Sequence, residues 1–204
     1  MRDVLRFIGG CPFARRFYLA GGTALALRLG HRRSVDLDFF SEQDEVAETT
    51  RREIRLALTA LEPLTLEDTE GNLLLEVRGL HIGFFGYGYP LMAPADTVEG
   101  VAIAGIADIG LMKLDALISR GSRKDFYDLY VIAQRTPLAE LLSLGPGKYA
   151  HARDFELMAV ESLVLFENAD RDIQPELFVD LPWEEVKEFF VAEAKALGLT
   201  WFGA

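Results

Sequence analysis

The apolar residues change their spacing near residue 100, and this change divides the chain into two kinds of structure. In the first part, short apolar runs bounded by glycines predict strands at 17–20, 35–39, 64–66, 73–77 and 80–85. Helical spacing predicts helices at 23–29 and 45–61. A turn-rich stretch at 86–100 follows. The remainder shows helical spacing, with helices expected at 108–119, 123–133, 155–166 and 183–197.

This order of elements predicts an α+β fold. We expect a mixed β-sheet with flanking helices in residues 1–100 and a helical region in residues 101–204. Of the 204 residues, 50% are hydrophobic, so the chain can bury a core of ordinary size. The apolar segment at 5–7 is too short to assign to an element.

The formal net charge of −11 argues against broad, sequence-independent binding of nucleic acid, which relies on Lys and Arg to neutralise phosphates. Contact with RNA is expected only at two basic clusters, for which a solvated surface is the alternative. They consist of His31, Arg32 and Arg33, and of Arg120, Arg123 and Lys124. The single cysteine, Cys11, excludes an intrachain disulfide framework. No stretch has the pattern of a signal peptide or a membrane span, so a cytoplasmic protein is expected.

A glycine pair follows the first predicted strand and precedes the first predicted helix. Gly21 and Gly22 lack Cβ atoms, so the backbone can turn sharply there and approach a ligand closely. The N-terminal amides of the following helix would point at a phosphate, and Thr23 could add a hydroxyl donor. The alternative is an ordinary turn without a ligand.

The strand at 35–39 has one oxygen-rich face. Side chains alternate between the faces of a strand, so Ser34, Asp36 and Asp38 share one side. Adjacent carboxylates repel each other unless a cation neutralises them. Mg²⁺, or Mn²⁺ in its place, suits this face because it binds carboxylate oxygens together with substrate phosphates. Residues 17–40 therefore predict metal-assisted chemistry on a nucleoside triphosphate.

Two stretches carry a family resemblance. GGTALALRLGHRRSVDLDFF at 21–40 joins the glycine pair to a D-x-D strand, and DIGLMKLDALISRGSRKDFYDLY at 108–130 joins a lysine-bearing helix to K-D-x-x-D. Both resemble motifs of the AbiEii/AbiGii toxin family, a branch of the nucleotidyltransferase superfamily. Residues 162–170 and 183–190 show a weaker similarity. The resemblance implies a nucleotidyltransferase-like core at 1–100 and a helical region at 101–204 that completes the active site.

The resemblance also implies roles for the second stretch. Lys113 corresponds to the family's catalytic lysine, and Lys124, Asp125 and Asp128 correspond to its K-D-x-x-D positions. From the residues alone, Lys113 could bind a triphosphate as a mobile charge or extend from a half-buried helix to solvent. Asp125 also forms a variant capping box with a serine three residues earlier, so capping is its structural alternative. Arg33 and Lys124 are expected to contact the nucleotide.

One expected ligand is missing. Many polymerase-type nucleotidyltransferases take a third carboxylate from a later strand, because two-metal catalysis needs enough acidic ligands. In the predicted strand at 80–85, Gly83 stands where such an acid is expected. Glu76 on the preceding strand is a candidate substitute, with an outward-facing charge as its alternative. Otherwise the site holds one metal firmly, with Asp125 or Asp128 in place of the missing acid.

The expected activity is the transfer of a nucleoside monophosphate from a nucleoside triphosphate. The two strand carboxylates hold the metal, the glycine turn and Ser34 position the phosphates, and Lys113 balances charge as pyrophosphate leaves. Asp125 or Asp128 orients or deprotonates the acceptor. The resemblance implies a tRNA 3′ end or a protein hydroxyl as acceptor and a cognate antitoxin as partner. The alternatives are a catalytically weak relative that only binds a nucleotide or a partner, and a metal-dependent nuclease.

Overall fold

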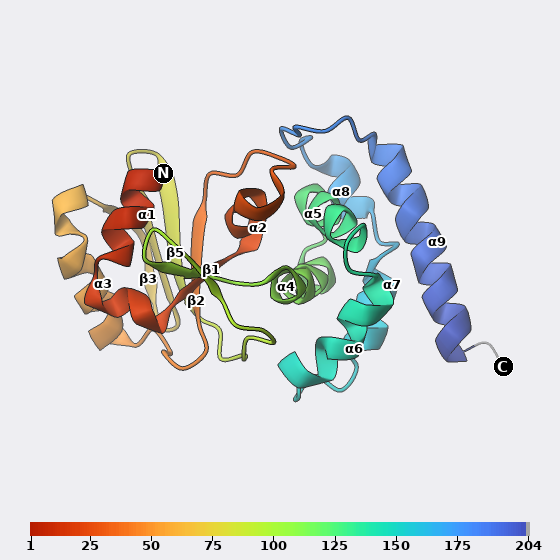
Figure 1. Cartoon of the computed structure of the whole chain (residues 1–204), viewed down its shortest axis with the longest axis horizontal. Coiled ribbons are helices and arrows are strands. Elements are labelled where there is room, and N and C mark those ends of the chain that lie inside the picture. The colour runs from red at the N-terminus through yellow and green to blue at the C-terminus, as the bar shows by residue number, and fades with distance from the viewer. Residues whose placement is uncertain (203–204) are drawn as a thin grey trace. The chain divides into compact units, whose positions relative to one another are not determined.

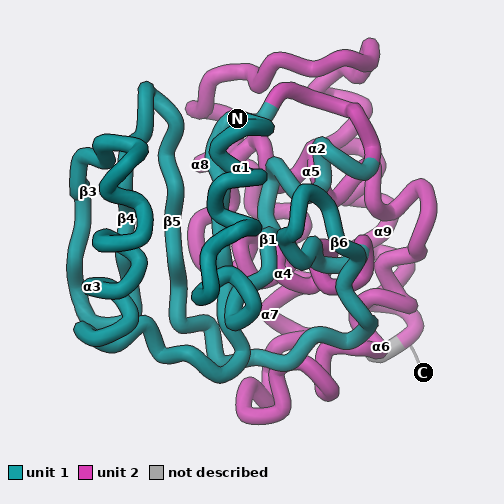
Figure 2. Tube along the Cα trace, turned by 60° about the vertical axis from the view of Figure 1, so that its left-hand side comes forward, with its two compact units in different colours: residues 1–28, 34–105 teal, residues 29–33, 106–204 magenta. Residues whose placement is uncertain are grey.

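A computed structural model describes residues 1–202 and divides the chain into two compact units. The first unit comprises Met1–Arg28 and Ser34–Gly105, and the second comprises Leu29–Arg33 and Ile106–Ala204 (Figure 2). The sequence predicted a division between residues 100 and 101. In the structure the second unit begins at Ile106 and also takes in five residues from the early part of the chain.

The first unit contains a seven-stranded mixed sheet, which confirms the predicted fold class. Its strand order is β3-β4-β5-β2-β1-β7-β6. Pairing is parallel between β2 and β5 and between β1 and β7, and antiparallel elsewhere. The strands are β1 (Tyr18–Ala20), β2 (Leu37–Ser41), β3 (Leu64–Thr69), β4 (Asn72–Val77), β5 (Leu80–Gly86), β6 (Asp96–Val98) and β7 (Val101–Ile103).

Helices cover both faces of this sheet. α1 (Arg2–Gly9) and α3 (Glu48–Ala57) lie on one side and α2 (Gly21–Leu29) on the other (Figure 1). The core on the α1 side is aromatic: the rings of Phe39 and Phe84 stack with centroids 5.0 Å apart, and Phe13 meets Phe84 edge-on. Each such buried ring contributes about 1.5–3 kcal/mol relative to exposure. This packing fixes the register of β2 beside β5, which carries the candidate site.

Several elements differ from the predictions. The N-terminal segment forms the amphipathic helix α1, and the predicted helix at 45–61 is split into α3 and a 3₁₀ turn at Thr59–Leu61. The stretch at 86–100, predicted as turns, contains β6. β6 and β7 have three residues each, too few for a periodic pattern, and β7 is held by non-local pairing with β1.

The second unit is helical, as predicted. α4 packs against three other helices, α5, α6 and α7. A helix that the sequence did not predict, α6, contains Pro146. The helices are α4 (Ile106–Ser119), α5 (Arg123–Ala133), α6 (Leu138–Lys148), α7 (Phe155–Ser162), α8 (Glu167–Arg171) and α9 (Trp183–Phe202). Within residues 1–202, no helix combines the length and apolarity that a membrane crossing requires.

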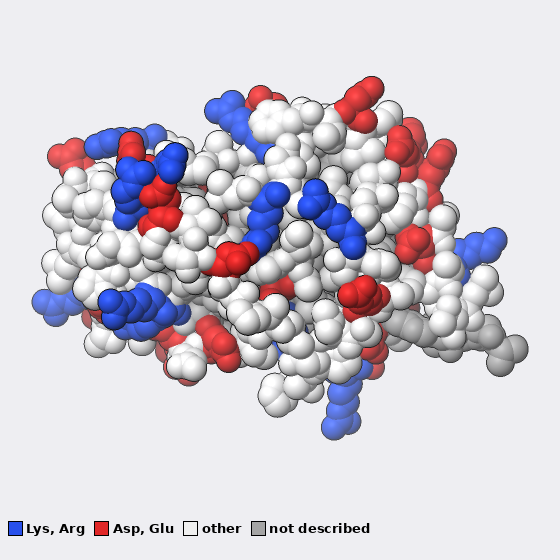
Figure 3. Space-filling model, in the orientation of Figure 1, with Lys and Arg blue, Asp and Glu red and all other residues white. Residues whose placement is uncertain are grey.

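The surface agrees with the acidic composition. On the face drawn in Figure 3, acidic and basic side chains are interspersed, and the basic ones form no continuous patch. This face therefore offers no extended surface of the kind that binds nucleic acid through its phosphates.

Candidate functional site

The glycine turn and the D-x-D strand meet in the first unit. β1 runs directly into Gly21, whose φ of +68° favours glycine, and α2 begins at this residue. Ala20, at the end of β1, pairs with Asp38 on β2. A Cβ atom on Gly21 would lie 2.9 Å from Oδ2 of Asp38, so a side chain at Gly21 would force the carboxylate to shift from this position. We call this arrangement the Gly21–Asp38 corner.

Two hydroxyl groups hold the corner together. The Thr23 hydroxyl hydrogen-bonds to the backbone carbonyl of Asp36, and it lies 3.0 Å from the Ser34 hydroxyl. Thr23 is buried and has only one hydroxyl proton to donate. The sequence predicted a phosphate contact for Thr23, but these contacts favour a positioning role instead, in which Thr23 ties the start of α2 to the segment before β2.

The corner offers hard oxygen donors. Asp36, just before β2, has a half-exposed side chain, and Asp38 is partly buried beneath the Gly21 turn. Carboxylate oxygens beside a backbone turn without a side chain fit a small divalent cation that also binds phosphates. Among residues 1–202, no group of three or more His, Cys, Asp or Glu side chains forms a ready-made metal site. Substrate phosphates would therefore have to supply part of any coordination shell.

Gly83 lies beside Asp38, at the position where the sequence led us to expect a third acid. The two residues pair across β2 and β5. A Cβ atom on Gly83 would meet the Phe85 ring at 2.4 Å and would lie 3.5 Å from Oδ1 of Asp38. An aromatic ring thus occupies the space of the missing side chain. Glu76 is on β4, one strand further from Asp38.

The sequence interpretation missed His81. Its Nδ1 atom lies 3.4 Å from Oδ1 of Asp36, and its Nε2 atom lies 4.0 Å from Oε2 of Glu76. Alternation along β5 puts His81 on the same face as Gly83, and this spacing is the signal that could have identified it.

The residues of the second stretch form a buried group in the second unit, which we call the cation–carboxylate cluster. Nζ of Lys113 lies 2.8 Å from Oδ1 of Asp125 and 2.6 Å from Oδ2 of Asp128. All three side chains are buried. Arg120, whose side chain is exposed, reaches the cluster from its rim, and the full set is Lys113, Asp125, Asp128, His31, Arg32 and Arg120.

The early segment Leu29–Arg33 supplies part of this cluster. Arg32 donates two hydrogen bonds to the carboxylate of Asp128, at 2.6 and 2.7 Å, and Nε2 of His31 lies 2.7 Å from the same carboxylate. Both side chains are buried. The prediction that His31 and Arg32 form a basic surface for RNA is therefore wrong, because burial and pairing with Asp128 remove them from solvent.

The other predicted basic contacts lie at the surface of the second unit. Arg33 is exposed and pairs with Glu176 at 3.2 Å, and Lys124 is exposed. Arg123 donates to the carbonyl oxygens of Ala169 and Asp170, which gives it a structural role within the unit. Arg33 and Lys124 stay predictions as nucleotide contacts.

The cluster holds its carboxylates in the ionised form. Burial alone would raise the pKa of Asp125 and Asp128, but Lys113 and the arginines outweigh it and hold both pKa values well below the usual range. Burial alone would lower the pKa of Lys113, but the two carboxylates outweigh burial and raise it. Such weakly basic carboxylates are poor proton acceptors at neutral pH. Their geometry favours orienting the cations over deprotonating an acceptor.

The predicted capping box at α5 is wrong in detail. Ser122 is the N-cap residue but makes no side-chain capping hydrogen bond. Its hydroxyl instead donates to Oδ2 of Asp125 at 2.5 Å, and Arg120 donates to the same carboxylate. The Asp125 carboxylate therefore accepts hydrogen bonds from side chains of the cation–carboxylate cluster and is not part of a capping box.

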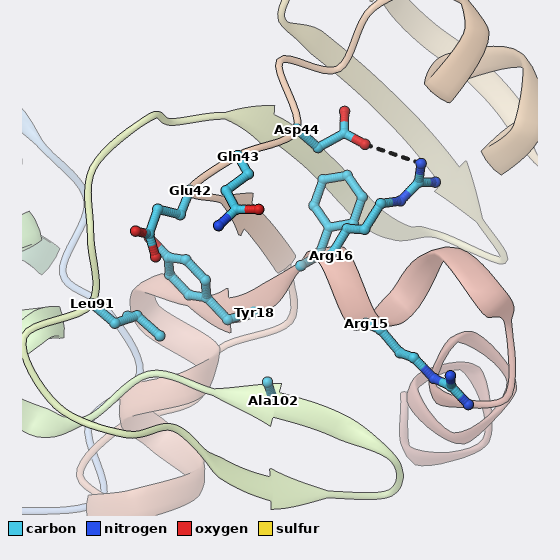
Figure 4. Close-up of a pocket in the computed structure, with 9 residues that line it drawn as sticks. Arg15, Arg16, Tyr18, Glu42, Gln43, Asp44, Leu91 and Ala102 are labelled. Atoms are coloured by element: carbon cyan, nitrogen blue, oxygen red, sulfur yellow. Dashed lines mark ion pairs between the residues drawn. The ribbon is translucent and has the colours of Figure 1, made fainter.

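A separate pocket of about 430 Å³ lies in the first unit, at the opposite ends of β1 and β2 from the Gly21–Asp38 corner (Figure 4). Arg16 and Asp44 form an ion pair at its wall, at 3.2 Å. The pocket is lined by Arg15, Arg16, Phe17, Tyr18, Glu42, Gln43, Asp44, Leu91 and Ala102. None of these residues was predicted as a site.

The mixed sheet, the glycine turn and the adjoining D-x-D strand define a nucleotidyltransferase. The sequence profile described as "Nucleotidyl transferase AbiEii toxin, Type IV TA system" matches residues 6–196, and the chain belongs to this family. The expected family and its class of enzyme are thereby confirmed.

Other comparisons agree with this fold. An uncharacterised protein of Aquifex aeolicus is 36% identical over 201 residues, which cover 95% of this chain and 94% of that protein. MenT4, a nucleotidyltransferase toxin from Mycobacterium tuberculosis, is similar in structure, with a TM-score of 0.58, 17% identity, and coverage of 95% of this chain and 82% of that one. JHP933 from Helicobacter pylori has a TM-score of 0.54 at 18% identity, with 98% and 89% covered. At such identities the two structures support the fold alone.

Proposed function

We propose that this protein transfers a nucleoside monophosphate from a nucleoside triphosphate to a hydroxyl group, with Mg²⁺ as cofactor. In this reaction an oxygen–phosphorus bond forms between the acceptor and the α-phosphate, and the bond from the α-phosphate to the β-phosphate oxygen breaks, so that pyrophosphate leaves. The observation that carries the proposal is the Gly21–Asp38 corner. It combines a glycine turn at the N-terminus of α2 with a carboxylate directly beside it.

The corner's residues have distinct roles in this proposal. Asp36 and Asp38 are the metal ligands, and the cation would neutralise phosphate charge and orient the reacting phosphate. Gly21 and Gly22 present backbone amides to the triphosphate at the N-terminus of α2. Ser34 positions the phosphates, and Thr23 maintains the turn through its hydrogen bond to the backbone of Asp36.

Roles for the second stretch follow from the resemblance and from the cation–carboxylate cluster. Lys113 balances charge as pyrophosphate leaves, while Asp125 and Asp128 hold its ammonium group in a fixed direction. Arg32 donates to the Asp128 carboxylate and Arg120 to the Asp125 carboxylate, so both acids are fixed on more than one side.

The acceptor in this proposal is an RNA 3′ end, with a protein hydroxyl as the other candidate. A cognate antitoxin is proposed as partner, because the family description refers to a type IV toxin–antitoxin system. Contact with RNA would be local, since the net charge is −11.

One observation favours a second candidate, a relative that binds nucleotide but transfers it poorly. The Phe85 ring fills the space beside Asp38 where a third carboxylate is expected. A site with fewer acidic ligands would hold a second metal weakly.

Incubation with Mg²⁺, each α-labelled nucleoside triphosphate in turn, and total RNA or protein tests these candidates. We expect labelled, lengthened RNA and released pyrophosphate, both abolished in Asp36→Ala. Glu70→Gln, which changes an exposed residue in the β3–β4 turn, is the matched control and should retain activity. Nucleotide binding without pyrophosphate release would support the second candidate, shortened RNA would indicate a nuclease, and transfer unaffected by Asp36→Ala would refute the assigned site.

A further inference from the structure

His81 and Asp36 are neighbours on the candidate site's face of the sheet. β5 runs parallel to β2, with Ile82 opposite Leu37, so the residues that precede them lie side by side. His81 shares its face with Gly83, which pairs with Asp38. The imidazole of His81 therefore lies on the same strand as Gly83, where the third carboxylate was expected, and two residues before it.

Each ring nitrogen of His81 faces a different carboxylate. Nδ1 lies 3.4 Å from Oδ1 of Asp36, on β2's side, and Nε2 lies 4.0 Å from Oε2 of Glu76, which pairs with His81 across β4 and β5. The three side chains thus lie in a row, from β4 through β5 to the segment just before β2. All three are partly exposed, so a cation can reach them from solvent.

The spacing in this row suits metal coordination. Two ligand atoms that each lie about 2.1 Å from one cation are about 3.0 Å apart in octahedral geometry and about 3.4 Å apart in tetrahedral geometry. The observed separation between Nδ1 and Oδ1 is 3.4 Å. Metal-bound histidines usually direct their second nitrogen at a carboxylate, which fixes the ring, and Glu76 lies in that direction.

We infer that His81 is a metal ligand of the nucleotidyl-transfer site, beside Asp36, with Glu76 as the carboxylate that orients its ring. This inference rests on the proposed function, because it assumes that Asp36 binds the divalent cation. It assigns the place of the absent third carboxylate to an imidazole. Asp36, Asp38 and His81 do not form a preformed three-residue site among the described residues, so the cation and the substrate phosphates would have to draw these ligands together.

A nitrogen ligand changes which metal the site prefers. Imidazole binds transition metals such as Mn²⁺ and Co²⁺ better than Mg²⁺, which is held mainly by oxygen. The site should therefore bind Mn²⁺ more tightly than Mg²⁺. Replacement of His81 by Asp should reverse this preference toward Mg²⁺.

Binding of Mn²⁺ to the full chain without nucleotide tests the inference independently of catalysis. The free ion is measured by its electron paramagnetic resonance signal, with wild type, Asp36→Asn, His81→Ala and Glu76→Gln compared. We expect His81→Ala to weaken binding at least tenfold and Glu76→Gln to weaken it about tenfold, as for other residues that orient a ligand. His151→Ala, which removes an exposed histidine of the second unit, is the matched control and should leave binding unchanged.

Nuclear magnetic resonance adds a direct readout. Substoichiometric Mn²⁺ should broaden the imidazole signals of His81 first and leave those of His151 sharp. Persistence of sharp His81 signals while Asp36→Asn weakens Mn²⁺ binding would overturn the inference and leave the proposed metal site intact. If neither Asp36→Asn nor His81→Ala alters Mn²⁺ binding, both the inference and the proposed metal site fail.

Discussion

Neutralising Asp128 should destabilise the second unit strongly. In Asp128→Asn the side chain keeps its size but loses the charge that faces Lys113, Arg32 and His31. Asp128 is fully buried, so water cannot replace the lost partner. Removing one member of a buried ion pair costs about 3–5 kcal/mol. That loss is a large fraction of the 5–15 kcal/mol that is typical for the unfolding of a whole domain, so we expect a marked fall in the urea midpoint.

A double-mutant cycle separates charge imbalance from lost packing. Arg32→Gln alone should cost about 1.5–3 kcal/mol, the range for hydrogen bonds to a charged group. Combined with Asp128→Asn, it removes one buried cation together with one buried anion. The double variant should therefore be more stable than the sum of the single effects predicts, by at least about 1 kcal/mol.

Tryptophan fluorescence in urea is the appropriate assay, because both tryptophans of the chain, Trp183 and Trp201, belong to the second unit. Circular dichroism at the same urea concentrations shows whether that unit unfolds in one step. The reasoning is refuted if Asp128→Asn loses less than about 1 kcal/mol, or if the two substitutions add within the 0.3–0.5 kcal/mol expected of independent sites.

Three further predictions concern the corner and the cluster. Gly21→Ala should lower label transfer at least tenfold, because its Cβ would displace Asp38. Gly71→Ala is the control: it imposes similar backbone strain (φ +83° against +68°) but has no atom nearby, so it should leave transfer unchanged. Equal losses in the two variants would contradict this prediction. Gly83→Asp should tighten Mg²⁺ binding, measured by calorimetry. The gain should be larger when Gly83→Asp is combined with Phe85→Ala, because the Phe85 ring occupies the space of the new side chain. Equal gains with and without Phe85→Ala would show that the ring does not obstruct the new carboxylate. The cluster's two carboxylates have folded-state pKa values below their usual 3.8, so their contribution to stability is complete above about pH 5 and falls as the pH drops through 4. Asp128→Asn should make this fall less steep when the free energy of unfolding is measured against pH in acid. An unchanged slope would contradict the prediction.

The sequence predicted those elements whose own segment shows a clear apolar period. The strand with Phe39 and the helix after Gly21 have clear apolar periodicity, and both were found within about two residues of the predicted bounds. β6 and β7 have too few residues for a period, and α6, which contains Pro146, was not predicted. Short strands of this kind depend on partners far away in the chain, which a local pattern does not contain.

The candidate site was predictable by residue type but only partly by environment. Lys113, Asp125 and Asp128 were singled out as a group, and the structure brings their charges together. Arg32 was predicted to be exposed because its partner, Asp128, is 96 residues away in sequence. His81 was missed for a similar reason, since its neighbour Asp36 precedes β2 and is distant from β5 in sequence.

The segment Leu29–Arg33 has a consequence for dissecting this protein. This segment lies between two parts of the first unit in sequence but belongs to the second unit. The backbone N–H of Arg33 donates a hydrogen bond to the backbone carbonyl of Glu176, and the backbone carbonyl of His31 accepts one from the N–H of Phe178. A helical fragment that starts at residue 106 would lack Arg32 and His31, and Asp128 would keep only Lys113 of the three side chains that face it. A single break in the chain therefore cannot separate the two units. Fragments, fusions and circular permutants must carry residues 29–33 with the helices they complete.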